Sequence, residues 1–221
     1  MNTRVYASNN PAPLFGQRNN AVYLFLKRAI DICVATCALI LLSPLLILAS
    51  VLIPLESPGS PLFSQDRVGK NGRLFRCWKF RSMFKDAEAR KSALMANNEM
   101  EGGVTFKMQR DPRITGIGRF IRKASIDELP QLWNVLVGDM TLVGPRPAVP
   151  SEVEQYTPLQ RRRLEVTPGI TCIWQVSGRS NLPFVRQVEL DIQYIQRQSL
   201  WLDLVLLVQT VPAVLTSRGA V

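Results

Sequence analysis

The sequence predicts an α+β fold: a mostly helical compact domain with a small β-hairpin, an N-terminal re-entrant membrane helix hairpin and interfacial amphipathic helices. Residues 32–53 form a 22-residue run without a charge. After that run, a few short β-prone stretches alternate with more numerous stretches of helical composition or periodicity. The length of 221 residues suits one domain with an appendage.

We expect three segments along the chain. Residues 1–20, rich in Asn and Pro, form a disordered tail. Residues 21–56 form the re-entrant membrane segment. Residues 57–221 form a cytosolic domain that ends in an interfacial helix.

The apolar run is long enough to cross a bilayer, at roughly 33 Å of helix, but Pro44 interrupts it. Proline removes a backbone hydrogen bond and bends a helix, and the hydroxyl of Ser43 can satisfy the freed carbonyl. Basic residues flank both ends of the run, so the positive-inside rule gives no orientation. We therefore favour a hairpin that enters and leaves by one face over a kinked span. A signal peptide and a buried soluble helix fit this length less well.

The remaining elements follow from local patterns. Asn71-Gly72 predicts a two-residue turn between β-prone runs. If residues 73–81 form a strand, its period of two places Lys79 and Arg81 on one face. Residues 199–215 are apolar but interrupted by polar residues and a proline, which indicates an interfacial helix, with a core helix as the alternative. Helical composition or periodicity also marks residues 84–96, 123–136, 152–166 and 182–200.

Charge and composition narrow the chemistry. The net charge is +10, and residues 66–123 hold 15 basic and 6 acidic residues. Such a field favours nucleic acid, anionic headgroups or phosphorylated substrates, unless it is only a solvated face. The absence of histidine excludes Ser-His and Cys-His nucleophiles and the commonest zinc sites. The four cysteines lack paired metal-ligand spacing and suggest no disulfide framework.

Two adjacent carboxylates, Asp127 and Glu128, have two interpretations. Ser125 and Glu128 match a capping box, in which both side chains satisfy free backbone N–H groups. Pro130 argues against it, because it would fall at the fifth helical position. A helix that begins nearer Glu128 or Leu129 would instead keep Asp127 ionised at its positive end. An ionised Asp near arginines and a metal can attack phosphorus. The residues alone leave both interpretations open.

Several spaced motifs carry a resemblance to a known family. "SIDELPQLWNVLVGDMTLVGPRP" (125–147) resembles the signature of the bacterial sugar transferases, the monotopic polyprenyl-phosphate phosphoglycosyl transferases. The stretches "KRAIDI", "LLSPLLILA", "FSQDRVGKNGRLFRCWKFRSM", "VTPGITCIWQVSGRS" and "ELDIQYIQRQSLWLDLVLL" resemble other family blocks in the expected order. The resemblance covers residues 27–216 and is to the small form of the family.

The resemblance implies transfer of sugar-1-phosphate from a UDP-sugar, expected to be glucose or galactose, to undecaprenyl phosphate, in exopolysaccharide, capsule or O-antigen synthesis. It implies two steps through a covalent aspartyl intermediate, with Asp127 as nucleophile and Glu128 as ligand of Mg²⁺. By the same resemblance, Ser43 and Pro44 form the re-entrant break, and Lys27 and Arg28 anchor to headgroups. The residues expected to hold phosphate or nucleotide are Lys79, Arg81, Arg122, Arg146, Arg179 and the prolines Pro145 and Pro147.

The implied partners are a UDP-sugar donor, undecaprenyl phosphate, anionic membrane lipids and, as an open alternative, a second copy in a homodimer. No nucleic acid is expected. The implied location is the cytoplasmic face of the bacterial inner membrane. Two rival hypotheses remain, a membrane-tethered nucleic-acid-binding regulator and a non-catalytic scaffold. The first explains the charge but lacks a recognition motif, and the second leaves the Asp-Glu pair as a helix cap.

Overall fold

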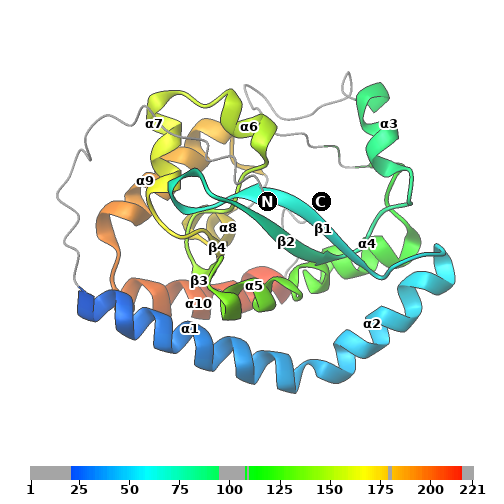
Figure 1. Cartoon of the computed structure of the whole chain (residues 1–221), viewed down its shortest axis with the longest axis horizontal. Coiled ribbons are helices and arrows are strands. Elements are labelled where there is room, and N and C mark those ends of the chain that lie inside the picture. Colours follow the sequence, from blue (N-terminus) through cyan, green and yellow to red (C-terminus); the bar gives the residue numbers. More distant parts are fainter. Residues whose placement is uncertain (1–20, 95–107, 109, 179–180, 216–221) are drawn as a thin grey trace.

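The computed structural model describes residues 21–94, 108, 110–178 and 181–215. Helices predominate, and two small two-stranded sheets accompany them, which confirms the α+β class. Two consecutive helices, α1 (Ala21–Leu41) and α2 (Ser43–Glu56), run along one side of the molecule (Figure 1). The other elements lie above them, and α1 packs directly on α5, β3 and α10. The predicted tail 1–20 lies outside the described residues.

The break between α1 and α2 falls where the sequence predicts it. Pro44 lies in the first turn of α2, and the two helices are bent by 61°. An unbroken helix would have used the N–H of residue 44 to satisfy the carbonyl of Ile40, and proline has none. The hydroxyl of Ser43 donates a hydrogen bond to that same carbonyl at 2.8 Å. Ser43 therefore satisfies locally the acceptor that Pro44 leaves open.

The predicted hairpin is present as β1 (Leu62–Val68) and β2 (Leu74–Phe80), paired antiparallel. Asn71 and Gly72 both have positive φ, at 56° and 80°, as a type I′ turn requires. The N–H of Arg73 donates to the carbonyl of Lys70 at 3.2 Å and closes the turn. The strand ends at Phe80, one residue before the predicted end.

A second sheet was not predicted. Strands β3 (Thr141–Val143) and β4 (Gly169–Thr171) pair in parallel, and each has only three residues. The two strand ends come unusually close: a Cβ on Gly169 would lie 2.1 Å from the backbone nitrogen of Gly144. Only glycine allows that approach, which brings the loop after β3 against the start of β4.

Helices fill most of the remaining chain, and the stretch 152–166 is divided into short pieces rather than one helix. The other α-helices are α3 (Ala87–Leu94), α4 (Gly116–Lys123), α5 (Gln131–Val137), α6 (Pro150–Glu154), α7 (Pro158–Arg161), α8 (Ile173–Ser177), α9 (Phe184–Arg197) and α10 (Leu200–Leu215). Short 3-10 helices occupy Lys70–Gly72, Ile126–Glu128 and Arg162–Glu165.

The core joins distant parts of the chain. Its largest cluster gathers Ala35 of α1, Val135 of α5, Val143 of β3, Tyr194 of α9 and Leu206 of α10, all nearly inaccessible to solvent. Full burial of a Val or Leu side chain, such as Val135 or Leu206, contributes about 1.5–3 kcal/mol to stability. This cluster fixes α1 to the same body as the strands.

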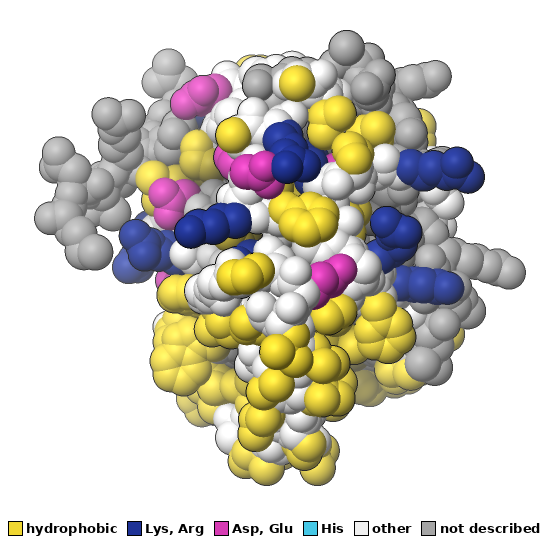
Figure 2. Space-filling view, turned by 90° about the vertical axis from the view of Figure 1, so that its right-hand side faces the viewer, with side chains coloured by type: hydrophobic (Ala, Val, Ile, Leu, Met, Phe, Trp, Pro, Cys, Tyr) yellow, Lys and Arg dark blue, Asp and Glu magenta, His cyan; other side chains and the backbone are white. Residues whose placement is uncertain are grey.

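Many large apolar side chains nevertheless remain exposed on four helices. Figure 2 shows hydrophobic side chains gathered over the lower part of one face, with the charged side chains above them. No single described helix is long and apolar enough to cross a membrane, and only the bent pair α1–α2, taken together, meets the criteria of length and composition among the described residues. The apolar face comprises residues more than half exposed on α1, α2, α5 and α10: Val22, Phe25, Ile40, Leu41, Ile47, Leu48, Val51, Leu55, Trp133, Val137, Trp201, Leu204, Val208 and Val211.

Candidate active site

Glu128 is the centre of a three-residue ion cluster. Its Oε1 atom accepts hydrogen bonds from Lys79 Nζ at 2.7 Å and from Arg146 at 2.8 Å. Burial alone would raise the pKa of Glu128, but Arg146 and Lys79 outweigh it and hold that pKa well below its usual range. In return, the negative charge of Glu128 raises the pKa of Arg146. Glu128 is therefore a fixed anion between two fixed cations.

The capping-box interpretation is wrong for this turn. Ser125 has a left-handed backbone conformation with φ of 56°, and its side chain caps no helix. The carboxylate of Glu128 turns to Lys79 and Arg146 rather than to the backbone. Helix α5 begins only at Gln131, after Pro130 as the N-cap. The adjacent carboxylates therefore have some role other than capping.

Asp127 lies beside Glu128 and is only 7% exposed. Among the residues that the structure describes, none donates a hydrogen bond to its carboxylate. Burial, and then the charge of Glu128, raise the pKa of Asp127, while Lys79, Arg122 and Arg146 act in the opposite direction. We expected the start of a helix to keep Asp127 ionised, but α5 begins too late for that, and burial dominates.

Lys79 reaches the cluster because β2 is fastened to α5. Asn134, in the middle of α5 and almost fully buried, accepts a hydrogen bond from the N–H of Trp78 at 3.0 Å. Its amide also donates to the carbonyl of Arg76 at 2.7 Å. One side chain thus satisfies two backbone groups on the free edge of β2 and sets the distance between Lys79 and the turn that carries Glu128.

Arg146 is held by the loop Gly144–Ala148. Arg67 of β1 donates to the carbonyl of Pro147 at 2.9 Å. The N–H of Val68 donates to the carbonyl of Ala148, and the N–H of Gly169 to that of Pro145, both at 2.9 Å. These three bonds come from the hairpin and from β4, so the loop is restrained from both sides.

Arg122 approaches the pair from α4. Its Nε donates to Ser82 Oγ at 2.9 Å. Burial lowers its pKa, and the charge of Asp127 is the largest opposing influence. The backbone of Ser82 lies so close to Gly118 that a Cβ there would be 1.9 Å from the Ser82 carbonyl oxygen. This contact sets how near α4, and with it Arg122, can come to the site.

Four predicted residues are not gathered here. Arg81 donates to the backbone carbonyls of Ser57 and Pro58 after α2, because it falls beyond the end of β2. Arg179 lies outside the described residues. Lys27 and Arg28 make contacts within the protein, and their expected contact with headgroups stays a prediction. Lys27 bonds to Asp203, and Arg28 donates to two carbonyls at the end of α5.

The carboxylates suit a magnesium ion bound jointly with a phosphorylated ligand. Among the described residues, no group of three acidic, His or Cys side chains could form a metal cage. Mg²⁺ usually takes only one or two carboxylates, and phosphate oxygens and water complete its shell. The second oxygen of Glu128 has no hydrogen-bond partner among the described residues, and Asp127 is adjacent. These two side chains fit that mode.

Sequence reasoning missed Asn134 and Arg67 as residues that position the site. Asn134 could have been noticed as an amide within the apolar run "LWNVL", since a buried amide requires partners. Arg67 also bonds to nearby Gln65, but its partner in the loop that carries Arg146, the Pro147 carbonyl, lies 80 residues away along the chain, and nothing local indicates it.

The chain matches the model of the bacterial sugar transferase family over residues 22–217. It is 50% identical over 201 residues to the "Galactosyl transferase CpsE" of Streptococcus agalactiae, covering 90% of this chain and 44% of that protein. It is 42% identical to the "Exopolysaccharide production protein ExoY" of Rhizobium meliloti, covering 88% of this chain and 87% of that protein. It is 44% identical to the "Undecaprenyl-phosphate galactose phosphotransferase" of Salmonella typhimurium, covering 89% of this chain and 42% of that protein.

The chain therefore belongs to the bacterial sugar transferase family. It spans less than half the length of two of these relatives and most of the third. The ion cluster lies within the matched region, and so do both helices of the bent pair except for Ala21.

Proposed function

We propose that the chain transfers a sugar-1-phosphate from a UDP-sugar to undecaprenyl phosphate, giving the lipid-linked diphosphate sugar and UMP. The observation that carries the proposal is the Asp127–Glu128 pair, with Asp127 buried and Glu128 half-buried beside Lys79, Arg122 and Arg146. Three converging cations suit a diphosphate. Two relatives are named for galactose and one, 40% identical, for glucose, so we propose glucose or galactose as the sugar.

In the first step, an Asp127 carboxylate oxygen attacks the phosphorus that bears the sugar. An oxygen–phosphorus bond forms, the bridging bond of the diphosphate breaks, and UMP leaves. The Asp127 carboxylate accepts no hydrogen bond from the described residues, so no such bond has to break before its oxygen attacks phosphorus. Lys79, Arg122 and Arg146 would stabilise the charge that develops on the phosphate oxygens.

In the second step, a phosphate oxygen of the acceptor attacks the same phosphorus and releases Asp127 unchanged. The restrained loop around Arg146 would keep the guanidinium in place for both substrates. Magnesium, held by Glu128 and Asp127, would neutralise the diphosphate when bound.

We further propose that the apolar face rests in the cytoplasmic leaflet of the inner membrane, with α1–α2 as a re-entrant pair. Fourteen large apolar side chains on four helices are more than half exposed, and large exposed apolar patches mark sites of membrane or protein contact. The net charge of +10 would add attraction to anionic lipids. An acceptor that cannot leave the membrane would then meet the site at the surface.

The test is UMP release from UDP-galactose, UDP-glucose and UDP-N-acetyl sugars, with and without undecaprenyl phosphate, in the presence of Mg²⁺. We expect acceptor-dependent UMP release and label from the sugar in the lipid fraction. No release with any donor would contradict the function. Salt-dependent binding to duplex DNA would then favour a nucleic-acid-binding regulator.

A further inference from the structure

We propose that a cavity between α1 and α10 holds a segment of the acceptor's polyprenyl chain; this inference rests on the proposed function. The cavity has a volume of about 160 Å³. Strand β3 contributes part of its wall. Its apolar lining residues are Ile30, Leu142, Val143, Leu200, Leu204 and Leu207.

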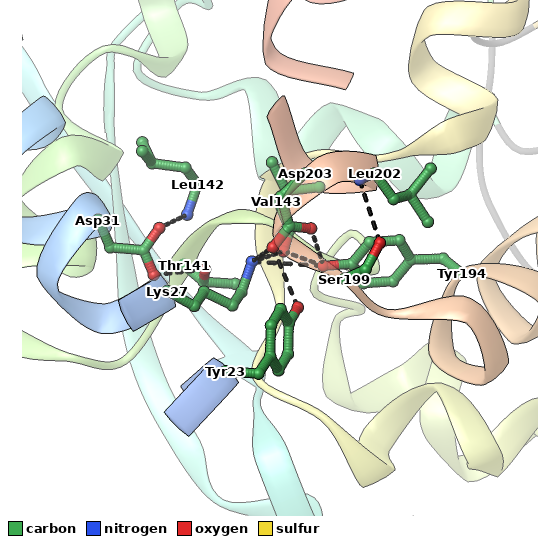
Figure 3. Close-up of polar contacts among 10 residues, drawn as sticks. All are labelled: Tyr23, Lys27, Asp31, Thr141, Leu142, Val143, Tyr194, Ser199, Leu202 and Asp203. Carbon is green, nitrogen blue, oxygen red and sulfur yellow. Dashed lines mark hydrogen bonds and ion pairs between the residues drawn. The ribbon is translucent and has the colours of Figure 1, made fainter. Parts of the chain in front are cut away.

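The charged residues at the cavity already have partners. Lys27 is an ammonium with three donors, and it bonds to Asp203 at 2.8 Å, the Val143 carbonyl at 2.9 Å and the Tyr194 hydroxyl at 3.3 Å. Figure 3 shows its amino group directed at these oxygens. No donor remains for a phosphate, so the site does not suit a headgroup.

The two carboxylates at the cavity are satisfied in the same way. Asp203 also accepts from the hydroxyls of Tyr23 and Tyr194, at 3.0 and 2.7 Å. Asp31 accepts from the Thr141 hydroxyl at 2.6 Å and from the Leu142 N–H at 3.0 Å (Figure 3). What the lining offers a ligand is hydrocarbon surface, and a hydrocarbon occupant is what it would bind.

The cavity opens onto the apolar face. Two of its lining residues, Ile30 of α1 and Leu204 of α10, are 42% and 52% exposed. A chain lying along that face can enter without crossing polar surface. An apolar cavity of about 150 Å³ stays dry and binds molecules the size of benzene, and one branched isoprene unit is of that size.

The cavity is also within reach of the site. Val143 lines it, and Arg146 follows three residues later, so the two Cα atoms are at most about 11 Å apart. An acceptor whose phosphate meets Arg146 can therefore place an early isoprene unit in the cavity. This proximity favours the acceptor over a phospholipid, whose headgroup has no reason to lie beside Arg146.

A matched pair of variants on α10 tests the proposal. Leu204→Trp would fill the mouth of the cavity, whereas Val208→Trp adds the same side chain one turn later, outside the cavity and 63% exposed. Both positions are on the surface, so neither change should prevent folding. Both alter the apolar face equally, so Val208→Trp controls for altered membrane contact.

We expect Leu204→Trp to raise the KM for undecaprenyl phosphate about tenfold, the loss from displacing about two methylene groups. The KM for the UDP-sugar should not change. Val208→Trp should change the acceptor KM by less than twofold. Equal effects of the two variants would overturn the proposal, because the shared cause would be membrane contact.

A binding experiment separates this inference from the proposed function. Wild-type protein in vesicles is irradiated with a diazirine-bearing polyprenyl phosphate or, separately, a diazirine-bearing phosphatidylethanolamine, without donor. The polyprenyl probe should label peptides containing residues 142–143 or 200–207, and Leu204→Trp should reduce that label. Labelling there by the phospholipid alone would overturn the proposal, even in an active enzyme. An enzyme that releases no UMP but keeps the polyprenyl label would instead contradict the function.

Discussion

The carboxylate of Glu128 lies 2.8 Å from the guanidinium of Arg146, and the same oxygen lies 2.7 Å from the ammonium of Lys79. Three separate segments, a strand, a 3-10 turn and a loop, meet at this one atom. The two cations are therefore in position before any substrate arrives. A diphosphate entering the site would find charges already oriented, which is the arrangement that stabilises a transition state most.

Lys79→Ala should reduce kcat by about 10²–10³, the usual cost of removing one preorganised donor. Lys85→Ala, at an exposed position five residues after β2, should reduce it less than threefold. The measurement is steady-state UMP release for both variants. Equal losses would mean that only the general positive field matters.

Glu128→Gln should weaken the dependence on Mg²⁺ and leave a residual rate, because an amide is a poorer ligand than a carboxylate. The rate of UMP release as a function of Mg²⁺ concentration measures both the dependence and the residual rate. A variant with an unchanged magnesium dependence would show that Glu128 serves only to orient Lys79 and Arg146.

Glu128→Gln should also change how strongly the free energy of unfolding depends on pH under acidic conditions. The pKa of Glu128 is lowered in the folded state, so its ion pairs contribute stability above the unfolded value of about 4.3. That contribution is lost as the pH falls through the folded value. Thermal unfolding between pH 7 and pH 3 should therefore show a shallower acid loss for Glu128→Gln than for the wild type.

Gly118→Ala should destabilise the fold by about 2–3 kcal/mol, because its Cβ would overlap the Ser82 carbonyl and force α4 away. Gly116→Ala is the control on the same helix. Its Cβ would meet the flexible end of Glu56 at 2.9 Å, so the cost should be under 1 kcal/mol. Chemical denaturation measures both, and similar costs would contradict the described approach of α4 to Ser82.

Pro44→Ala should straighten the α1–α2 pair and push the segment toward spanning, because alanine supplies the backbone N–H in whose place the Ser43 hydroxyl now bonds to the Ile40 carbonyl. A cysteine introduced at Val22 or at Ser60 reports the side of the membrane when the exposed Cys33 and Cys37 are replaced by serine, since the remaining Cys77 and Cys172 are buried. In inverted vesicles of protein that keeps Pro44, the cysteines at positions 22 and 60 should both react with an impermeant thiol reagent. If Val22 is protected there, the segment spans and the re-entrant proposal fails.

Local chemistry predicted the turn and the break, since each depends on adjacent residues. Asn71-Gly72 adopts the positive φ angles that few residue types tolerate, and Ser43 bonds to the carbonyl that Pro44 leaves unpaired. The intramolecular contacts of Lys27 and Arg28 could not be predicted from adjacent residues. Lys27 pairs with Asp203, 176 residues away, and the flanking of an apolar run made a lipid contact the natural expectation.

The site itself was predicted in part. Lys79, Arg122, Arg146 and the carboxylate pair converge, whereas Arg81 does not, because β2 ends one residue earlier than expected. The residues that set the spacing, Asn134 and Arg67, act through backbone groups of other segments. Such contacts depend on the packed fold and leave little trace in local sequence.

The most direct test of the proposed mechanism is to trap the intermediate on Asp127. Protein is incubated with Mg²⁺ and a UDP-sugar labelled in the sugar-bound phosphate, without polyprenyl phosphate, and then denatured. We predict that one label remains on the protein, maps to Asp127, and is discharged when polyprenyl phosphate is added before denaturation. Asp127→Asn should fold, since it removes a buried charge whose pKa is raised, and should retain no label. An active Asp127→Asn enzyme, or a label that maps elsewhere, would contradict the account.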